Sequence, residues 1–266
     1  MTTPQPVLDR LEFGLDGARR ASELILTHYR ADHLAVERKR DSSPVTEADR
    51  GAEQLLRARI LQAFPHDGVL GEEFGETPGT SGFRWILDPV DGTKSFIHGV
   101  PLFGTLIGLE LHGDPVMGIC RLPALDEVVY AAAGGPAYQQ TGLQPARCAR
   151  VSAVRRLADA TFCFTTVQGF ERIRRADLFA TMVARAGLVR GWGDCYGHLL
   201  VATGQADIMI DPLMNVWDIA ALIPILEAAG GACVDWQGRR RVDGGNGISV
   251  NAALKDEVLA LVNGGL

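Results

Sequence analysis

The segment of residues 85–96, WILDPVDGTKSF, constrains this chain more than any other stretch. Its apolar beginning predicts a buried strand, and two carboxylates, Asp88 and Asp91, follow at once. Because they lie three residues apart beyond a strand, both can reach one group of cations, and the Val90 carbonyl oxygen can join them. Gly92 allows an anion to approach the backbone closely. The segment therefore predicts either a metal site or an ordinary aspartate-rich turn, such as often follows a strand.

Composition and charge narrow the classes of function. The chain has 266 residues, of which 47% are hydrophobic and 22% are charged, so it can bury a sizeable core. It has no apolar run of about 18 residues and no signal-peptide pattern at its start, so we expect a cytoplasmic protein without a membrane partner. A formal net charge of -6 without a long basic stripe argues against nucleic-acid binding. Metal ions would have to attract any substrate that carries phosphate.

The order of helical and strand-like segments predicts a mixed α/β chain. Residues 6–33 have the apolar spacing of one long helix, and Thr46 begins a second helix with Asp49 as its capping partner. Residues 75–82, rich in glycine, threonine and serine, predict a loop. After residue 160, short strands alternate with helices, which indicates a compact α/β half. The segments expected to pair as antiparallel strands of one sheet are 104–111, 116–121 and 127–132. The helices expected in the second half are 176–186, 196–204 and 219–229.

Carboxylates also occur at three places outside the central segment. Asp49 stands at a helix start, Glu72 and Glu73 end a short apolar run, and Asp218 precedes an apolar helix. Each position alone is explained as a cap or a loop residue. Taken together and in this order, they make the chain resemble the inositol monophosphatase family, whose members are magnesium-dependent phosphatases. The blocks that carry the resemblance are 46–49, 71–73, 85–96 and 217–231.

The resemblance implies a fold and an assembly. The expected fold is α/β (α+β), the five-layered α-β-α-β-α sandwich of inositol monophosphatase-like proteins. Residues 1–266 would form a single catalytic unit, with an α+β metal-binding part in residues 1–150 and an α/β substrate-specificity part in residues 151–266. The family also implies a homodimer that acts on a small-molecule phosphate monoester.

The resemblance further implies two or three Mg²⁺ ions, for which Mn²⁺ could substitute, held by oxygen ligands. The implied metal ligands are Glu72, Glu73, Asp88, Asp91, Asp218 and the carbonyl group of Val90. The implied catalytic residues are Glu72, Thr93 and Asp49. Glu72 and Thr93 would orient and activate the attacking water, and Asp49 with Glu73 would shape an outer metal site or hold a third ion. The backbone N–H groups of Gly92 and Thr93 would bind the phosphate, and Lys39 would lie in a loop near the metals.

Two positions in the sequence indicate which kind of leaving group the site would bind. Lys94 stands where inositol-preferring members of the family more often have threonine, and Asp194 stands where they have threonine. With Asp211, the second position would place two carboxylates beside the leaving-group pocket, which suits the ammonium and imidazole of histidinol better than neutral inositol. Asp194 could instead cap the helix expected near Tyr196, and Trp192 could line the pocket or belong to the core.

These features, together with the blocks 104–108 and 194–198, resemble the histidinol-phosphate phosphatase branch of the family most. We therefore predict a magnesium-dependent phosphoric monoester hydrolase that converts L-histidinol phosphate to L-histidinol and phosphate in histidine biosynthesis. One alternative is an inositol-phosphate phosphatase or a broader sugar-phosphate phosphatase. Another is a metal-binding scaffold that keeps the fold without catalysis.

Overall fold

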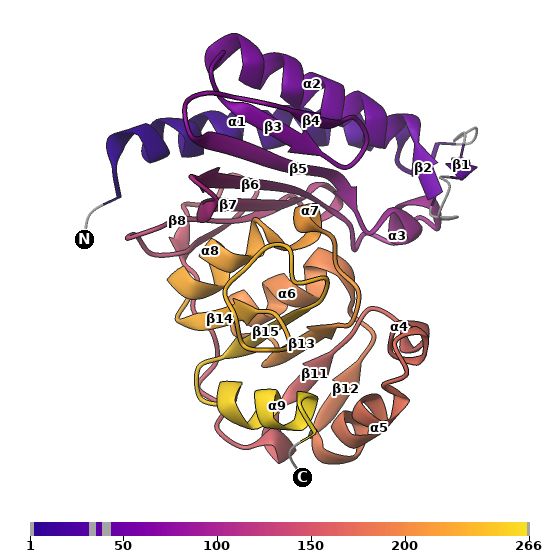
Figure 1. Cartoon of the computed structure of the whole chain (residues 1–266). Coiled ribbons are helices and arrows are strands. Elements are labelled where there is room, and N and C mark those ends of the chain that lie inside the picture. Colours follow the sequence, from indigo (N-terminus) through magenta and orange to yellow (C-terminus); the bar gives the residue numbers. More distant parts are fainter. Residues whose placement is uncertain (1–2, 32–35, 39–43, 265–266) are drawn as a thin grey trace.

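The elements of the chain stack in five layers, helix on sheet on helix on sheet on helix (Figure 1). The structure, a computed structural model, describes residues 3–31, 36–38 and 44–264, so the expected loop residue Lys39 lies outside the described residues. Both sheets are sandwiched between helices, as the pattern of alternating strands and helices predicts. The expected α/β sandwich is therefore confirmed. Among the described helices, none has the length and apolar character needed to cross a membrane.

The first sheet has eight strands within the described residues. In sheet order they are β10 (Arg147–Cys148), β9 (Tyr138–Thr141), β8 (Glu127–Ala132), β7 (Asp114–Leu122), β6 (Gly104–Leu111), β5 (Phe83–Asp91), β3 (Gly68–Gly71) and β4 (Gly75–Thr77). The antiparallel neighbours expected from the sequence are β6, β7 and β8, and this prediction is confirmed. Strand β5 pairs with β6 on one side and runs parallel to β3 on the other.

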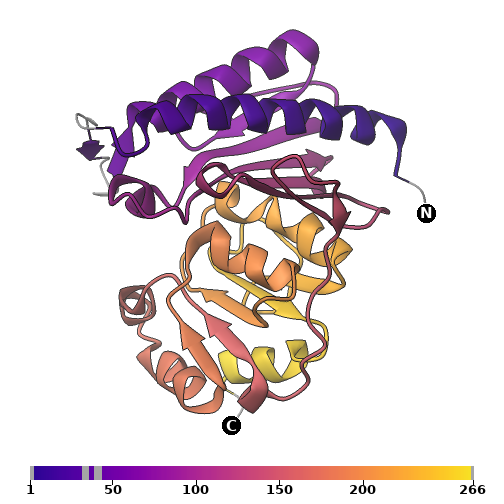
Figure 2. The same ribbon diagram turned by 180° about the vertical axis from the view of Figure 1, so that it is seen from behind.

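Helices α1 (Gln5–His28) and α2 (Glu47–Ala63) cover the outer face of this sheet (Figure 2). Helix α2 begins with the predicted capping box, in which the Asp49 carboxylate accepts hydrogen bonds from the N–H and the hydroxyl of Thr46. Because β5 is in contact with α2 on one face and with α7 (Val216–Ile219) on the other, its sequence reads as a continuous apolar run. Trp85 in this strand is completely buried.

The second sheet has five strands within the described residues. In sheet order they are β12 (Leu188–Arg190), β11 (Thr161–Cys163), β13 (Ile208–Asp211), β15 (Gly247–Asn251) and β14 (Gly231–Val234). The outer helices that pack on its far face are α4 (Val167–Arg172), α5 (Ala176–Arg185) and α9 (Lys255–Val262). The shorter elements are β1 (Val36–Arg38), β2 (Pro44–Thr46), α3 (Thr93–Ile97) and the 3-10 helices η1 (Pro123–Leu125) and η2 (Leu157–Asp159).

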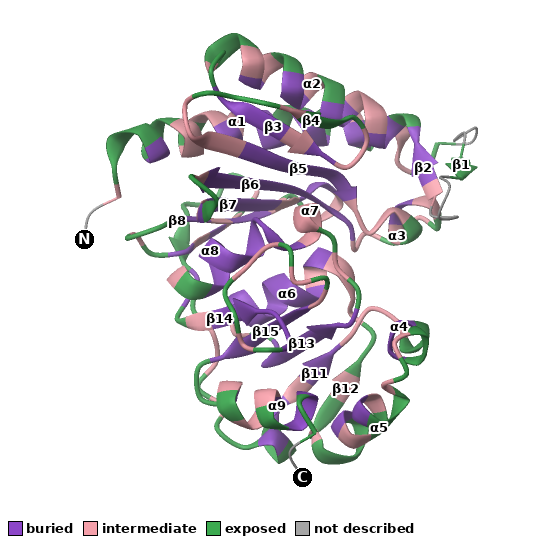
Figure 3. Ribbon diagram, viewed as in Figure 1, coloured by how far each residue is buried: buried purple, intermediate pink, exposed green. Residues whose placement is uncertain are grey.

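The middle layer consists of α6 (Asp194–Ala202), α7 and α8 (Leu222–Ala228). Figure 3 shows that α6 and α8 are buried along most of their surface, whereas α1, α5 and α9 expose one face. The first sheet approaches this layer closely at Gly118, where an added Cβ would overlap the carbonyl oxygen of Ala221. A single apolar core therefore joins the middle layer to both sheets, and it contains side chains from both halves of the chain.

Several boundaries differ from the sequence-based predictions. The helix predicted at 219–229 is divided into α7, which begins at Val216, and α8. The first helix ends at His28, not His33, because Tyr29 turns away to donate a hydrogen bond from its hydroxyl to the carbonyl oxygen of Gly99, at 2.6 Å. Part of the predicted loop 75–82 is strand β4, which extends the edge of the sheet by pairing with β3. The predicted helix 196–204 begins two residues earlier, at Asp194.

Candidate active site

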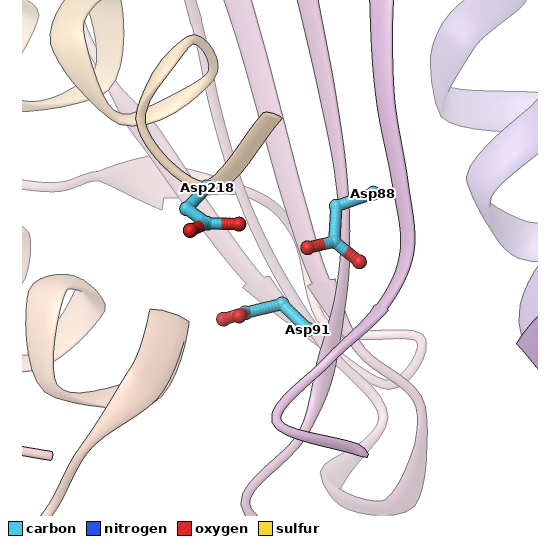
Figure 4. A group of neighbouring side chains, drawn as sticks. All are labelled: Asp88, Asp91 and Asp218. Carbon is cyan, nitrogen blue, oxygen red and sulfur yellow. The ribbon is translucent and has the colours of Figure 1, made fainter. Parts of the chain in front are cut away.

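Three aspartates from two elements meet at the boundary between the first sheet and the middle layer. Asp88 and Asp91 come from the end of β5, and Asp218 comes from α7 (Figure 4). One carboxylate oxygen of each lies within 4.8 Å of the others. The pairing of β5 with β6 is irregular between Asp88 and Asp91, as in a β-bulge, which redirects side chains at the end of a strand. The sequence-based expectation that these residues converge is met by this geometry.

Hydrogen bonds hold the irregular end of β5 in place. The N–H of Val90 donates to Oδ1 of Asp88 at 3.1 Å, and the Thr105 hydroxyl donates to the carbonyl oxygen of Pro89 at 2.8 Å. The N–H of Cys195, at the start of α6, donates to the carboxylate of Asp91. The end of β5 is therefore fixed by β6 of the same sheet and by α6 of the middle layer, which preorganises its carboxylates.

The electrostatics of the cluster favour a cation. Burial raises the pKa of Asp88 well above its usual range, and the charges of Glu72, Asp91 and Asp218 raise it further. The pKa of Asp91 is raised in the same way, by burial and then by Asp194 and Asp218. Burial is also the main cause that raises the pKa of Asp218 to about 7. Oxygen ligands at a site of negative potential are what Mg²⁺ requires, so the residues present fit this ion.

Glu72 and Glu73 occupy different surroundings. The N–H of Glu72 donates to the carbonyl oxygen of Leu87 at 3.2 Å, which places Glu72 beside β5, and its charge raises the pKa of Asp88. The N–H of Glu73 donates to Oε2 of Glu53 in α2 at 2.7 Å, and its charge raises the pKa of Arg50. The charge of Glu72 therefore acts on an aspartate of the cluster, whereas the charge of Glu73 acts on Arg50 in α2.

Thr93 stands between the aspartate cluster and α2. Its hydroxyl lies 3.0 Å from the carbonyl oxygen of Val90 and 3.3 Å from Oδ1 of Asp49, to either of which it can donate. Because Oδ2 of Asp49 serves the capping box, Asp49 both caps α2 and contacts Thr93. The two interpretations of Asp49, as a cap and as a site residue, are thus compatible. Gly92, at the start of α3, has a φ of 80°, a conformation that glycine adopts without strain.

A cavity of about 380 Å³ opens from the aspartate cluster into the second half of the chain. Its lining includes Asp91, Lys94 and Asp218, and also Asp194 and Asp211. The cavity therefore connects the expected metal ligands with the two carboxylates expected to contact the leaving group. Trp192 packs against the core between the sheets, the second of the two roles predicted for it.

Asp194 does not cap α6. The N-cap is Gly193, and Asp194 itself has a φ of 54°, in the left-handed region that aspartate tolerates better than most residues. Its N–H donates to the hydroxyl of Thr165 at 2.8 Å. Burial, followed by the charge of Asp211, raises the pKa of Asp194 to about 7, whereas the charge of Lys94 lowers it. An unusual backbone conformation at a pocket residue indicates a functional constraint.

Sequence reasoning missed residues that act through other elements. His198 in α6 is buried and lies beside Asp211, and Glu53 in α2 holds the backbone after Glu72. The N–H of Cys195 binds Asp91, a backbone interaction that no side-chain pattern could reveal. His198 follows Asp194 by four residues, one helical turn, and ends the block 194–198 that resembles the histidinol-phosphate phosphatase branch, so the spacing and the resemblance both pointed toward the pocket.

Comparisons with known proteins agree with this geometry. A model of the inositol monophosphatase family matches residues 9–264. A histidinol-phosphatase of Chlorobaculum parvum is 43% identical, covering 96% of this chain and 97% of that protein. A histidinol-phosphatase of Mycobacterium tuberculosis is 38% identical, covering 97% and 99%. The solved structure of an inositol monophosphatase from Zymomonas mobilis, 31% identical, superposes with a TM-score of 0.84 and covers 98% of this chain and 100% of its own. The chain therefore belongs to the inositol monophosphatase family and is a phosphoric monoester hydrolase.

Proposed function

We propose that the protein hydrolyses L-histidinol phosphate to L-histidinol and phosphate, as a step of histidine biosynthesis, and that it depends on Mg²⁺. One observation carries the choice of substrate: Asp194 and Asp211 line the same cavity as Asp91 and Asp218 of the aspartate cluster. Two relatives that resemble this chain over nearly their full length are named histidinol-phosphatase, which supports the proposal.

Asp88, Asp91 and Asp218 would hold Mg²⁺, with Glu72 and the Val90 carbonyl group as further ligands. Two or three ions would bind, Mn²⁺ could substitute, and Glu73 remains a candidate for an outer site. When bound, Mg²⁺ supplies Lewis-acid chemistry and neutralises the charge of the phosphate.

The residues around Thr93 would position the attacking water. If the Thr93 hydroxyl donates its proton to Asp49, its oxygen is free to accept a hydrogen bond from that water. Glu72, beside β5, would accept the second hydrogen bond and act as the general base. The N–H groups of Gly92 and Thr93 would bind the phosphate, because they lie at the start of α3, where backbone donors are not used within the helix.

The carboxylates beyond the phosphate would recognise the leaving group. Asp211 is buried and Asp194 is partly buried, and carboxylates in such surroundings are stabilised when they pair with positive charge. Histidinol offers an ammonium group and an imidazole that can be protonated, whereas inositol is neutral. A cationic leaving group therefore complements this end of the cavity better than a neutral one.

We further infer that residues 1–266 work as one catalytic unit, since Asp91 from residues 1–150 and Asp194 from residues 151–266 line the same cavity. In this division the first part is the metal-binding part, to which the second adds Asp218, and the second part selects the substrate. A homodimer and a cytoplasmic location remain predictions.

A substrate panel tests the proposal. With Mg²⁺ present, we expect kcat/KM for L-histidinol phosphate to exceed that for inositol 1-phosphate by about 100-fold or more, the discrimination available to a site built for specific polar groups. Asp194→Asn, which keeps the shape of the side chain and removes its charge, should lower this ratio by about tenfold. A preference for inositol 1-phosphate would favour the alternative substrate class. If no phosphate ester is hydrolysed with Mg²⁺ or Mn²⁺, the protein is a metal-binding scaffold.

A further inference from the structure

His198 forms a bridge between Asp211 and the interior of the second sheet. It is 1% exposed and lies in α6. Its Nδ1 is 2.7 Å from the hydroxyl oxygen of Ser249 in β15, and its Nε2 is 3.2 Å from Oδ2 of Asp211 at the end of β13. Three elements thus contribute one polar group each to a buried row that ends at the cavity.

The chemistry of the three groups gives the row a direction. The Asp211 carboxylate can only accept, so Nε2 of His198 must carry the proton between them. In a neutral imidazole, Nδ1 is then an acceptor, and the Ser249 hydroxyl donates to it. Both ring nitrogens of His198 are occupied in this way, so His198 has no nitrogen left for a ligand in the cavity.

The row also determines which part of Asp211 faces a ligand. Oδ2 of Asp211 is engaged by His198, so Oδ1 is the oxygen left for a group that enters the cavity. A carboxylate at the end of a strand can rotate about its side-chain torsions, and a fixed hydrogen bond from a buried ring removes that freedom. Orientation of a side chain by a neighbour that is itself locked is how a binding site is preorganised.

We propose that His198 is a positioning residue for substrate selection: together with Ser249 it holds Asp211 in the orientation that receives the cationic part of the leaving group. This inference rests on the proposed function, because a neutral leaving group would gain little from an oriented carboxylate. His198 acts through Asp211 and not on the phosphate, so its loss should affect substrate binding more than the chemical step.

Two substitutions at one position separate the two bonds of His198. The amide oxygen of asparagine reaches roughly as far as Nδ1 of histidine and can accept from the Ser249 hydroxyl, so His198→Asn can keep the bond to Ser249 and loses the bond to Asp211. The amide nitrogen of glutamine reaches roughly as far as Nε2, so His198→Gln can keep the bond to Asp211. We expect His198→Asn to raise KM for L-histidinol phosphate about tenfold and to change kcat by less than about twofold. His198→Gln should keep KM within about threefold of the wild-type value.

The same measurements with inositol 1-phosphate show whether the effect is selective. We expect His198→Asn to change its kcat/KM by less than about twofold, so that the preference for L-histidinol phosphate falls about tenfold. Ser249→Ala, which removes the donor to Nδ1 together with a contact to the Cys233 thiol, should lower this preference by a smaller factor, about threefold. The matched control is Ser152→Ala, which removes a hydroxyl donor from another buried carboxylate, Asp207, away from the cavity, and should leave the preference unchanged.

The outcomes distinguish the inference from the proposed function. If the wild-type protein does not prefer L-histidinol phosphate, both are wrong. If the wild type prefers it but His198→Asn lowers kcat/KM for both substrates equally, or His198→Gln behaves as His198→Asn does, the positioning role is refuted and the proposed function stands. Should His198→Asn fail to fold, as judged by its melting curve, Ser249→Ala decides the question, and an unchanged preference in that variant overturns the inference.

Discussion

Asp88→Asn should make the metal-free protein more stable and the enzyme inactive. Asp88 is buried, and negative neighbours together with burial raise its pKa well above the usual range. A carboxylate oxygen of Asp88 lies within 4.8 Å of one of Asp218, so the two carboxyl groups favour a proton on one of them. Asparagine can still accept from the N–H of Val90 and can donate to Asp218, but it carries no charge.

The size of the effect follows from the spacing of the carboxylates. Two unit charges 4.8 Å apart repel by about 3.5 kcal/mol at an effective dielectric constant of about 20. A shared proton already relieves part of this repulsion, so we expect Asp88→Asn to raise the free energy of unfolding of the metal-free protein by about 2 kcal/mol. In a chain of this length, such a gain raises the melting temperature by about 4 to 8 °C.

The assay compares melting curves and turnover with and without metal. In EDTA, scanning calorimetry should give a higher melting temperature for Asp88→Asn than for the wild type. In saturating Mg²⁺, the wild type should gain more than the variant, because the variant has lost a ligand. Turnover of L-histidinol phosphate should fall by at least about 1,000-fold. A metal-free variant that melts below the wild type, or a turnover rate near that of the wild type, would refute the reasoning.

Three further predictions concern pH, the attacking water and packing. The pKa values of Asp194 and Asp218, raised in the folded protein to about 7, mean that the folded state keeps protons that the unfolded state releases above about pH 4. The stability of the metal-free protein should therefore fall as pH rises from 5 to 8, and Mg²⁺ should raise the melting temperature more at pH 8 than at pH 5. A melting temperature in EDTA that rises over this pH range would contradict the raised pKa values of Asp194 and Asp218. Thr93→Val, which removes the hydroxyl beside Asp49 and keeps the shape of the side chain, should lower kcat by about 100-fold while leaving the stabilisation by Mg²⁺ unchanged. Single-turnover rates near those of the wild type would exclude a role of Thr93 in positioning the attacking water. Gly118→Ala should lower the free energy of unfolding by about 3 kcal/mol or more in denaturant titrations, because its Cβ overlaps a backbone atom of the middle layer that cannot move alone. A loss below about 1 kcal/mol would show that the first sheet and the middle layer can separate at little cost.

Much of the fold was predictable because the responsible interactions are local or periodic. The apolar run before Asp88 predicts β5, and turn residues separate the segments that form β6, β7 and β8. Thr46 and Asp49 lie three residues apart, so their capping box, and with it the start of α2, is determined within one helical turn. Long-range contacts explain the boundaries that were predicted wrongly, since the end of α1 depends on Gly99, 70 residues away from Tyr29.

The candidate site likewise has features that the sequence determines and features that depend on tertiary contacts. The sequence by itself determined which residue types are available, namely carboxylates after β3, at the end of β5 and before α8, and their order identified the family. It could not determine that Asp194 leaves the cap position to Gly193, because that depends on the backbone conformation that Thr165 stabilises. The tertiary structure decided this point.

Asp211 shows most clearly the difference between what the sequence determines and what the tertiary structure determines. Its carboxyl group was predictable as a residue near the pocket, but its orientation depends on His198 and Ser249, which are 13 residues before it and 38 after it in the sequence. Local sequence sets backbone hydrogen bonding and the period of apolar residues, which act over a few residues. The direction of a buried side chain is set by partners that only the packing of α6 against β13 and β15 brings together, so the tertiary structure alone decided it.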